Sequence, residues 1–259
     1  MHDRGPAAYV AEFIGTLALV FFICSAVVLF VSARFTDFVV IGLVHLFALF
    51  FLIQTLALVS GAHLNPAVTV ALAAIKQIKP PDAVIYVVAQ LAGGVAAGLL
   101  VRVLFTEFPN AEAQNFGAPG LTDRIGGKVG LGMLAEFLGT FFLMFTIVGV
   151  AVNPRSSKDW AALAIGGALG VGVMALGPLT GGSFNPARAF GPALVADSFD
   201  GAGKFLLAYV LAPILGSLAA AFAYSVMFIA PDSEDSGGME PEDSGAMEPE
   251  DSGGMEPVG

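Results

Sequence analysis

The sequence predicts an all-α membrane protein with six transmembrane helices plus two re-entrant half-helices, arranged as inverted three-helix repeats. Composition is the first observation, because 56% of the 259 residues are hydrophobic, only 12% are charged, and the mean hydropathy is +0.83. Soluble domains of this size do not have such a composition. The other observations are a series of long uncharged stretches and an Asn-Pro-Ala motif in each half of the chain.

Each transmembrane helix is expected where an apolar stretch reaches the length of about 20 residues that crosses a bilayer core. The expected spans are residues 8–33, 38–60, 82–105, 129–152, 160–179 and 204–230. The first of these is too long for a cleaved signal peptide, lies between Glu12 and Arg34, and precedes five similar stretches. We therefore expect it to remain in the mature chain.

The formal net charge of -10 comes from the C-terminal segment 231–259, which has acidic residues and no basic one, whereas the rest of the chain is balanced. This segment holds near-identical acidic octapeptides at 234–241, 242–249 and 250–257. A low-complexity sequence of this kind cannot bury a core, so we expect it to be disordered. Basic residues divide evenly between the two membrane faces, so the positive-inside rule gives no orientation.

An internal repeat organises the membrane body. Residues 11–17 reappear as 135–141, and residues 61–67 reappear as 181–187, in the same order. The chain therefore divides into a first repeat (1–105), a connecting loop (106–127) and a second repeat (128–230). Three spans in each repeat is an odd number, so the second repeat enters from the opposite face and the functional site is expected near the midplane.

The repeated motif marks two helix starts, because asparagine is a favoured N-cap and proline a favoured first helical residue. The helices that follow have only about 10 residues, or about 15 Å, so neither can cross the core alone. Irregular backbone before each helix requires a water-filled cavity, where its carbonyls would accept and the asparagine amides would donate hydrogen bonds. The predicted pore motif consists of Asn65, Pro66, Ala67, Asn185, Pro186 and Ala187.

Ionisable side chains at membrane depth are candidate functional groups. Arg188 lies in the first turn of the second half-helix, where its charge and the helix dipoles would oppose cations; snorkelling to the headgroups is the alternative. Glu12 and Glu136 occupy equivalent positions and either couple protons or, as we favour, accept hydrogen bonds from the irregular loops. His45 reads as a pore-wall group and His63 as a loop-fixing one. The pattern contains no nucleophile motif, phosphate loop or metal-ligand cluster, so we expect no catalysis, metal or cofactor.

The segments Gly-Ala-His-Leu-Asn-Pro-Ala-Val-Thr at 61–69 and Gly-Gly-Ser-Phe-Asn-Pro-Ala-Arg-Ala-Phe-Gly-Pro at 181–192 resemble those of the aquaporins, or major intrinsic proteins. The resemblance covers about residues 8–230. It implies a water channel that excludes ions, with one pore per protomer, in a homotetramer whose termini are cytoplasmic. The implied partners are the cell-membrane lipid bilayer, water and small neutral solutes, and no nucleic acid.

The family's selectivity filter, carried over by counting from the two asparagines, implies His45, Val173, Gly182 and Arg188. A strict water channel usually has an aromatic ring at the first position and histidine at the second. This set looks like that of some vacuolar plant aquaporins that pass ammonia, and the loss of bulk at Val173 and Gly182 predicts a wider opening. A glycerol-type facilitator is an alternative, although Ala189 stands where those proteins usually have aspartate. A proton-coupled secondary transporter would also explain inverted repeats.

Overall fold

The computed structural model describes residues 5–31, 37–109, 111–199 and 201–229. The predicted disorder of the acidic segment 231–259 lies outside these residues. Within the described ranges, six helices are long and apolar enough to cross a membrane, as predicted. They are α1 (Pro6–Phe30), α2 (Phe38–Ser60), α4 (Pro80–Phe105), α5 with its π-helical extension η3 (Val129–Ile147 and Val148–Val152), α6 (Ala161–Thr180), and α8, η4 and α9 (Ala202–Phe205, Leu206–Leu211 and Ala212–Met227).

The two half-helices are α3 (Pro66–Ala74) and α7 (Pro186–Ala196), and each begins at the proline of its motif. Their caps, Asn65 and Asn185, have extended φ angles of -157° and -154°, so each cap residue lies outside the helix and the helix begins at the proline that follows. The fold is therefore the predicted one, six spanning helices with two short helices that enter without crossing.

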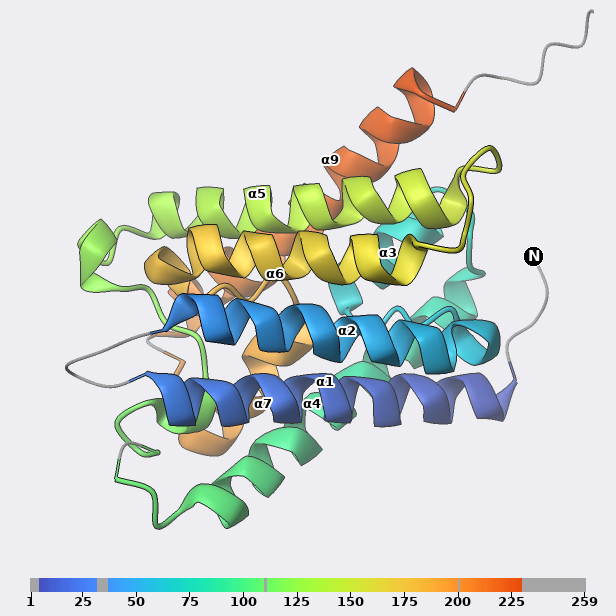
Figure 1. Cartoon of the computed structure of the whole chain (residues 1–259). Helices are drawn as coiled ribbons and strands as arrows, with labels where there is room; N and C mark the ends of the chain where they lie inside the picture. The colour runs from blue at the N-terminus through green and yellow to red at the C-terminus, as the bar shows by residue number, and fades with distance from the viewer. Residues whose placement is uncertain (1–4, 32–36, 110, 200, 230–259) are drawn as a thin grey trace, which may run out of the picture. The chain divides into compact units, whose positions relative to one another are not determined.

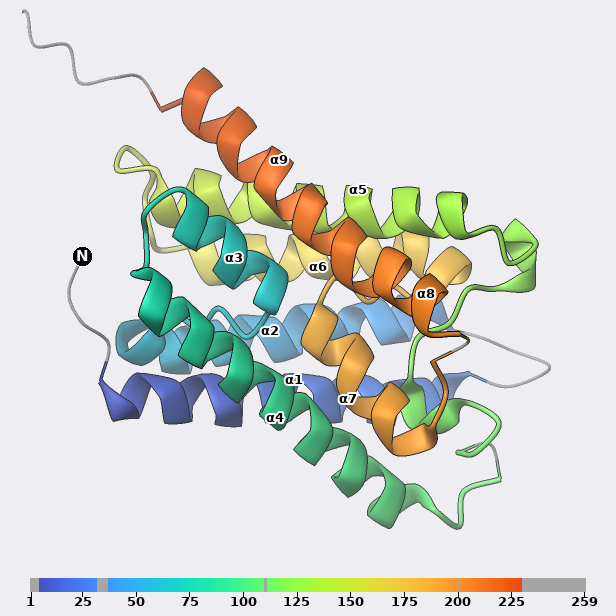
Figure 2. The same cartoon turned by 180° about the vertical axis from the view of Figure 1, so that it is seen from behind.

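Long helices of the two halves occupy equivalent places. Helices α1, α2, α6 and α5 contact one another in that order, and α4 packs on α1 as α9 packs on α5 (Figure 1). Each half-helix packs mainly against the third long helix of the other half, α3 on α9 and α7 on α4, and α3 contacts α7 (Figure 2). This exchange brings the two motifs together at the centre of the bundle.

Glycine allows these helices to approach closely. A Cβ atom on Gly93 of α4 would overlap the carbonyl oxygen of Phe13 in α1, and one on Gly216 of α9 would overlap that of Phe137 in α5. At the crossing of α4 with α7, a Cβ atom on Gly191 would overlap the backbone of Gly94. Small residues at such crossings replace side-chain packing with backbone contact, as in other membrane helix pairs.

The last span is not a continuous α-helix, contrary to the simple apolar stretch that the sequence shows. Pro213 has no backbone N–H for an α-helical bond to Tyr209, and the preceding turn, η4, is π-helical. The connecting loop between α4 and α5 contains two short 3-10 helices, η1 (Asn115–Gly117) and η2 (Asp123–Ile125).

Candidate functional site: the central cavity and its two motifs

Each motif asparagine has its side-chain oxygen bound by the helix that it begins. Asn65 Oδ1 accepts from the Ala67 N–H at 2.9 Å, and Asn185 Oδ1 accepts from the N–H groups of Ala187 at 2.9 Å and Arg188 at 3.3 Å. Because backbone N–H groups only donate, these bonds identify the oxygen and leave the amide nitrogen on the opposite side. Both amides are thereby held in one orientation.

The amide nitrogens bind across the two halves. Asn65 Nδ2 donates to the carbonyl of Phe184 at 2.8 Å, and Asn185 Nδ2 donates to the carbonyl of Leu64 at 2.8 Å. A side-chain amide has two N–H groups, so each asparagine keeps one for the cavity that both residues line. The motifs therefore present two fixed donors at the place where the half-helices meet.

Two buried carboxylates hold the loops that precede the half-helices. Glu12 accepts from the backbone N–H groups of His63 at 2.9 Å and Leu64 at 2.7 Å, and Glu136 accepts from those of Ser183 at 3.0 Å and Phe184 at 2.7 Å. Side chains complete the sets: Ser60 and Gln90 donate to Glu12, and Thr180 donates to Glu136. An acceptor that binds several donors at once fixes irregular backbone that has no helix to stabilise it.

A leucine and a phenylalanine anchor these loops in the helix that carries the carboxylate. Leu64 and Phe184 have positive φ angles of 50° and 51°, and both are fully buried. A Cβ atom on Gly15 would overlap Leu64, and one on Gly139 would overlap the ring of Phe184. Each glycine lies three residues after its glutamate. The repeated Glu-Phe-x-Gly pattern therefore encodes both the hydrogen-bond acceptor and the space into which Leu64 or Phe184 packs. This role of the glycine was not predicted from the sequence.

Two tyrosines bind the C-terminal ends of the second helices of the two halves, α2 and α6. This pair was not predicted from the sequence. Tyr86 donates to the carbonyl of Ser60 and Tyr209 donates to that of Thr180, both at 2.8 Å. Each tyrosine lies seven residues before the glycine, Gly93 or Gly216, that contacts the first helix of its half. That shared spacing is a sequence signal that could have identified them.

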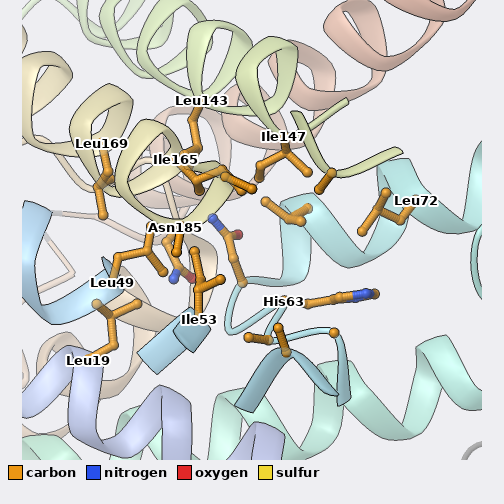
Figure 3. Close-up of a pocket in the computed structure, with 18 of the residues that line it drawn as sticks. Leu19, Leu49, Ile53, His63, Leu72, Leu143, Ile147, Ile165, Leu169 and Asn185 are labelled. Carbon is orange, nitrogen blue, oxygen red and sulfur yellow. The ribbon is translucent and has the colours of Figure 1, made fainter. Parts of the chain in front are cut away.

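Both asparagines line a cavity of about 570 Å³. Figure 3 shows Asn185 among the aliphatic side chains of its wall. His45 and Arg188 line it in one direction, whereas Gln54, Gln77 and Lys158 line it in the other. Between these polar groups the wall is mainly aliphatic, with leucine and isoleucine side chains from four long helices: Leu19, Ile23, Leu49, Ile53, Leu143, Ile147, Ile165 and Leu169. A solute inside meets few polar partners other than the asparagines and the side chains at the two ends.

The polar pair on one side of the motifs combines an acceptor with a cation. His45 Nδ1 lies 2.8 Å from the carbonyl of Ile41, which can only accept, so Nδ1 carries the hydrogen and Nε2 of the neutral ring is an acceptor. Arg188 is 1% exposed and donates from Nη1 to the carbonyl of Gly117 at 2.9 Å. Within the part of the chain that the structure describes, His45 Nε2 and Arg188 Nε have no hydrogen-bond partner.

The other two predicted filter residues lie behind this pair. Val173 is fully buried, and a Cβ atom on Gly182 would meet Val173 at 3.3 Å and Gly177 at 3.2 Å. The absent side chain of Gly182 would therefore point at α6, and its φ of 59° is in the left-handed region. The expectation that glycine widens the opening by removing bulk needs correction, because this position allows close packing of the loop on α6.

The described residues contain no group of His, Cys, Asp and Glu side chains arranged to hold a metal ion. The chemistry that the site offers is hydrogen bonding and fixed charge along an aliphatic passage.

Comparison with known proteins agrees with this architecture. Residues 5–224 match the model of the family described as major intrinsic protein. The chain is 36% identical to Nodulin-26 of Glycine max over 226 residues, covering 84% of this chain and 76% of that protein. It is also 36% identical to Aquaporin AqpM of Methanothermobacter thermautotrophicus over 240 residues, covering 84% of this chain and 96% of that protein.

A solved structure gives the same result for the fold. The aquaglyceroporin from Plasmodium falciparum matches with a TM-score of 0.74 and 25% identity, covering 85% of this chain and 96% of the other. The chain is therefore a multi-pass integral membrane protein that belongs to the major intrinsic protein family, the aquaporin family of membrane channels.

Proposed function

We propose that this protein is a passive channel that conducts water and small uncharged solutes such as ammonia, and that excludes ions and protons. The observation that carries the proposal is the cavity that connects the two motif asparagines with the His45–Arg188 pair. Its aliphatic wall forms no hydrogen bonds that would retain a solute. Its few polar groups lie at the motifs and near the ends of the cavity, where they can replace hydrogen bonds that a solute loses. A path of this kind favours rapid passage over tight binding.

The motifs provide the central hydrogen bonds. A water molecule whose oxygen accepts from Asn65 and Asn185 must turn its own hydrogens away from both, because its acceptor side is occupied. Helices α3 and α7 also direct their positive ends to this place, so a cation or a proton meets an unfavourable potential there. Water exchanges its partners at the motifs while a chain of proton transfers is interrupted.

The pair formed by His45 and Arg188 acts on solutes by hydrogen bonding and charge. His45 Nε2 can accept a hydrogen bond from a solute and Arg188 Nε can donate one, so water or ammonia can replace hydrogen bonds that it loses on entry. Guanidinium keeps its positive charge in proteins, which makes the same opening costly for cations. We propose His45, Val173, Gly182 and Arg188 as the filter, with the first and last contacting the solute.

Glycerol-type conduction is the second candidate, because the aliphatic wall of the cavity suits a carbon backbone and an aquaglyceroporin has a similar fold. Ala189 argues against it: this residue is buried in one apolar cluster with Ala193, Phe205 and Tyr209, at the position where glycerol facilitators usually have aspartate. A proton-coupled transporter is disfavoured by Glu12 and Glu136, since each carboxylate already accepts two backbone N–H bonds that protonation would weaken.

Assembly and orientation complete the proposal. Large apolar side chains such as Val39, Phe47, Val88, Val103 and Val226 are exposed on the outer faces of the long helices, as contact with lipid or with neighbouring protomers requires. We propose a homotetramer in the cell membrane with cytoplasmic termini, as is typical of the family.

The rate at which proteoliposomes change volume after an osmotic shift, followed by light scattering, tests the function. Vesicles that contain the protein should shrink faster than empty vesicles in an osmotic gradient, should pass ammonia, and should not collapse a proton gradient. Equal water permeability with and without protein would refute the water-channel assignment. Fast glycerol entry would favour the second candidate, and uptake that depends on a proton gradient would favour the transporter.

A further inference from the structure

The side chain of Arg188 is held by the connecting loop. Its partner, the carbonyl of Gly117, belongs to η1 (Asn115–Gly117), a segment that we call the strap. The thiol of Cys24 in α1 points at the same carbonyl oxygen, with the sulfur at 3.6 Å. The strap therefore holds the guanidinium through a hydrogen bond that is fully buried.

The strap has an unusual backbone conformation. Asn115, Phe116 and Gly117 have consecutive positive φ angles of 47°, 50° and 88°. Residues other than glycine adopt this region only when their surroundings require it. A Cβ atom on Gly117 would lie 2.6 Å from Cys24 Cα, so the strap is pressed against α1.

Phe116 is the side chain that anchors the strap. It is 6% exposed and packs in one cluster with Val20, Val28 and Val101 from α1 and α4. Its backbone N–H donates to the carbonyl of Ala111 at 2.9 Å. Burial of the ring fixes Phe116 in its unusual conformation, and the next residue presents the carbonyl that binds the arginine.

Arg102 connects this anchor to the half-helix that carries Arg188. Its guanidinium carbon lies 5.7 Å from the centre of the Phe116 ring, and its Nη1 donates to the carbonyl of Val195 at 2.9 Å. Val195 is the penultimate residue of α7. A cation at this position also interacts favourably with the negative end of the helix dipole. One planar guanidinium thus contacts both the ring and the far end of α7, which a lysine cannot reproduce.

We propose that Arg102 and Phe116, neither of which lines the cavity, are positioning residues that determine selectivity by holding Arg188 at the constriction. This inference rests on the proposed function, in which Arg188 forms the barrier to cations. When the strap loosens, the charge of Arg188 stays in the chain but the guanidinium leaves its fixed place. The barrier then falls without loss of the water path.

Two variants test the proposal in proteoliposomes. Arg102→Gln removes the guanidinium, and Phe116→Leu keeps an apolar side chain but removes the ring. Proton leak, measured with an entrapped pH dye, should rise roughly tenfold in each, the size expected from the loss of one charge-assisted hydrogen bond, while water permeability stays within about twofold. Arg124→Gln, the matched control, removes an equal charge from the connecting loop at a position outside the strap, and it should leave the leak unchanged.

A double variant separates positioning from a general effect on structure. In an Arg188→Val background, Arg102→Gln should add no further leak, because the residue that it positions is absent. An additive leak, or no leak in both Arg102→Gln and Phe116→Leu while Arg188→Val leaks, would overturn the inference. Absence of leak in Arg188→Val itself would instead refute the proposed role of Arg188. Reconstituted protein is quantified in every vesicle preparation. If Arg102→Gln or Phe116→Leu does not assemble, the other variant decides the outcome.

Discussion

Asn65 and Asn185 are bonded reciprocally: each donates an amide hydrogen to the carbonyl of the residue that immediately precedes the other, Phe184 or Leu64, at 2.8 Å. The two half-helices therefore share one hydrogen-bonded junction, although 120 positions separate the motifs in the chain. Substitution of either asparagine therefore removes a hydrogen bond from the loop of the other half.

Asn185→Asp should damage that junction while keeping its shape. The capping oxygen remains, but the donor to Leu64 becomes an acceptor that faces a carbonyl, and the site gains negative charge. We expect a loss of stability of about 1–3 kcal/mol, as for a buried group left without its partner, and some passage of cations. Thermal unfolding in detergent and cation flux measure the two effects. An ion-tight variant of unchanged stability would show that the reciprocal bond is unimportant.

Arg188→Val should make the channel leak protons and small cations while water still passes. A barrier lowered by about 1.4 kcal/mol corresponds to a roughly tenfold faster leak. The dipoles of α3 and α7 remain, so the leak should stay partial. Arg188→Lys separates charge from shape: it retains the charge and should be tighter than Arg188→Val in the same pH-dye assay. If the valine variant is as proton-tight as wild type, Arg188 does not form the barrier.

His45→Phe should reduce ammonia passage more than water passage. The change removes the Nε2 acceptor and adds bulk in the same opening, and ammonia depends on that acceptor because it has one lone pair and several hydrogens. The ratio of the two permeabilities in stopped-flow experiments is the readout. Leu49→Phe, which adds a ring to the aliphatic wall farther along α2, is the control and should change the ratio less. An unchanged ratio in His45→Phe would remove His45 from the filter.

Gly182→Ala should lower stability more than it narrows the pore. Its φ of 59° is unfavourable for alanine, and the added Cβ would crowd Val173 at 3.3 Å. We expect about 1–3 kcal/mol of destabilisation, partly relieved by Val173→Ala, measured by thermal unfolding. A variant of normal stability whose water permeability falls sharply would show that the side chain points into the cavity instead.

Mercurial reagents should not inhibit this channel. Gly182 occupies the proposed filter position where some aquaporins have a reactive cysteine. Cys24, the one cysteine of the chain, is fully buried with its thiol against the Gly117 carbonyl. Water permeability before and after treatment is the test. Inhibition that disappears in Cys24→Ser would mean that the reagent reaches the strap and acts on Arg188 through it.

Much of this molecule could be predicted from local sequence. Apolar length predicted the spans, the Asn-Pro pairs predicted both half-helix starts, and the odd number of spans in each repeat predicted their inversion. Those features depend on periodicity, capping and chain direction, which are properties of neighbouring residues. Prediction was weaker at Pro213, because a proline in an apolar stretch allows either a kink or the π-helical turn that the structure contains.

Only the tertiary structure decided what each candidate residue contacts. Spacing placed Gly182 three residues before Asn185 and Arg188 three residues after it. The left-handed backbone turns the Cβ direction of Gly182 toward α6, so Arg188 and His45 line the cavity instead. Spacing also gave no sign that the carbonyl of Gly117, in the connecting loop, would accept a hydrogen bond from Arg188. Positive φ angles and bonds between segments 71 or more residues apart arise from packing of the whole bundle, which no local pattern encodes.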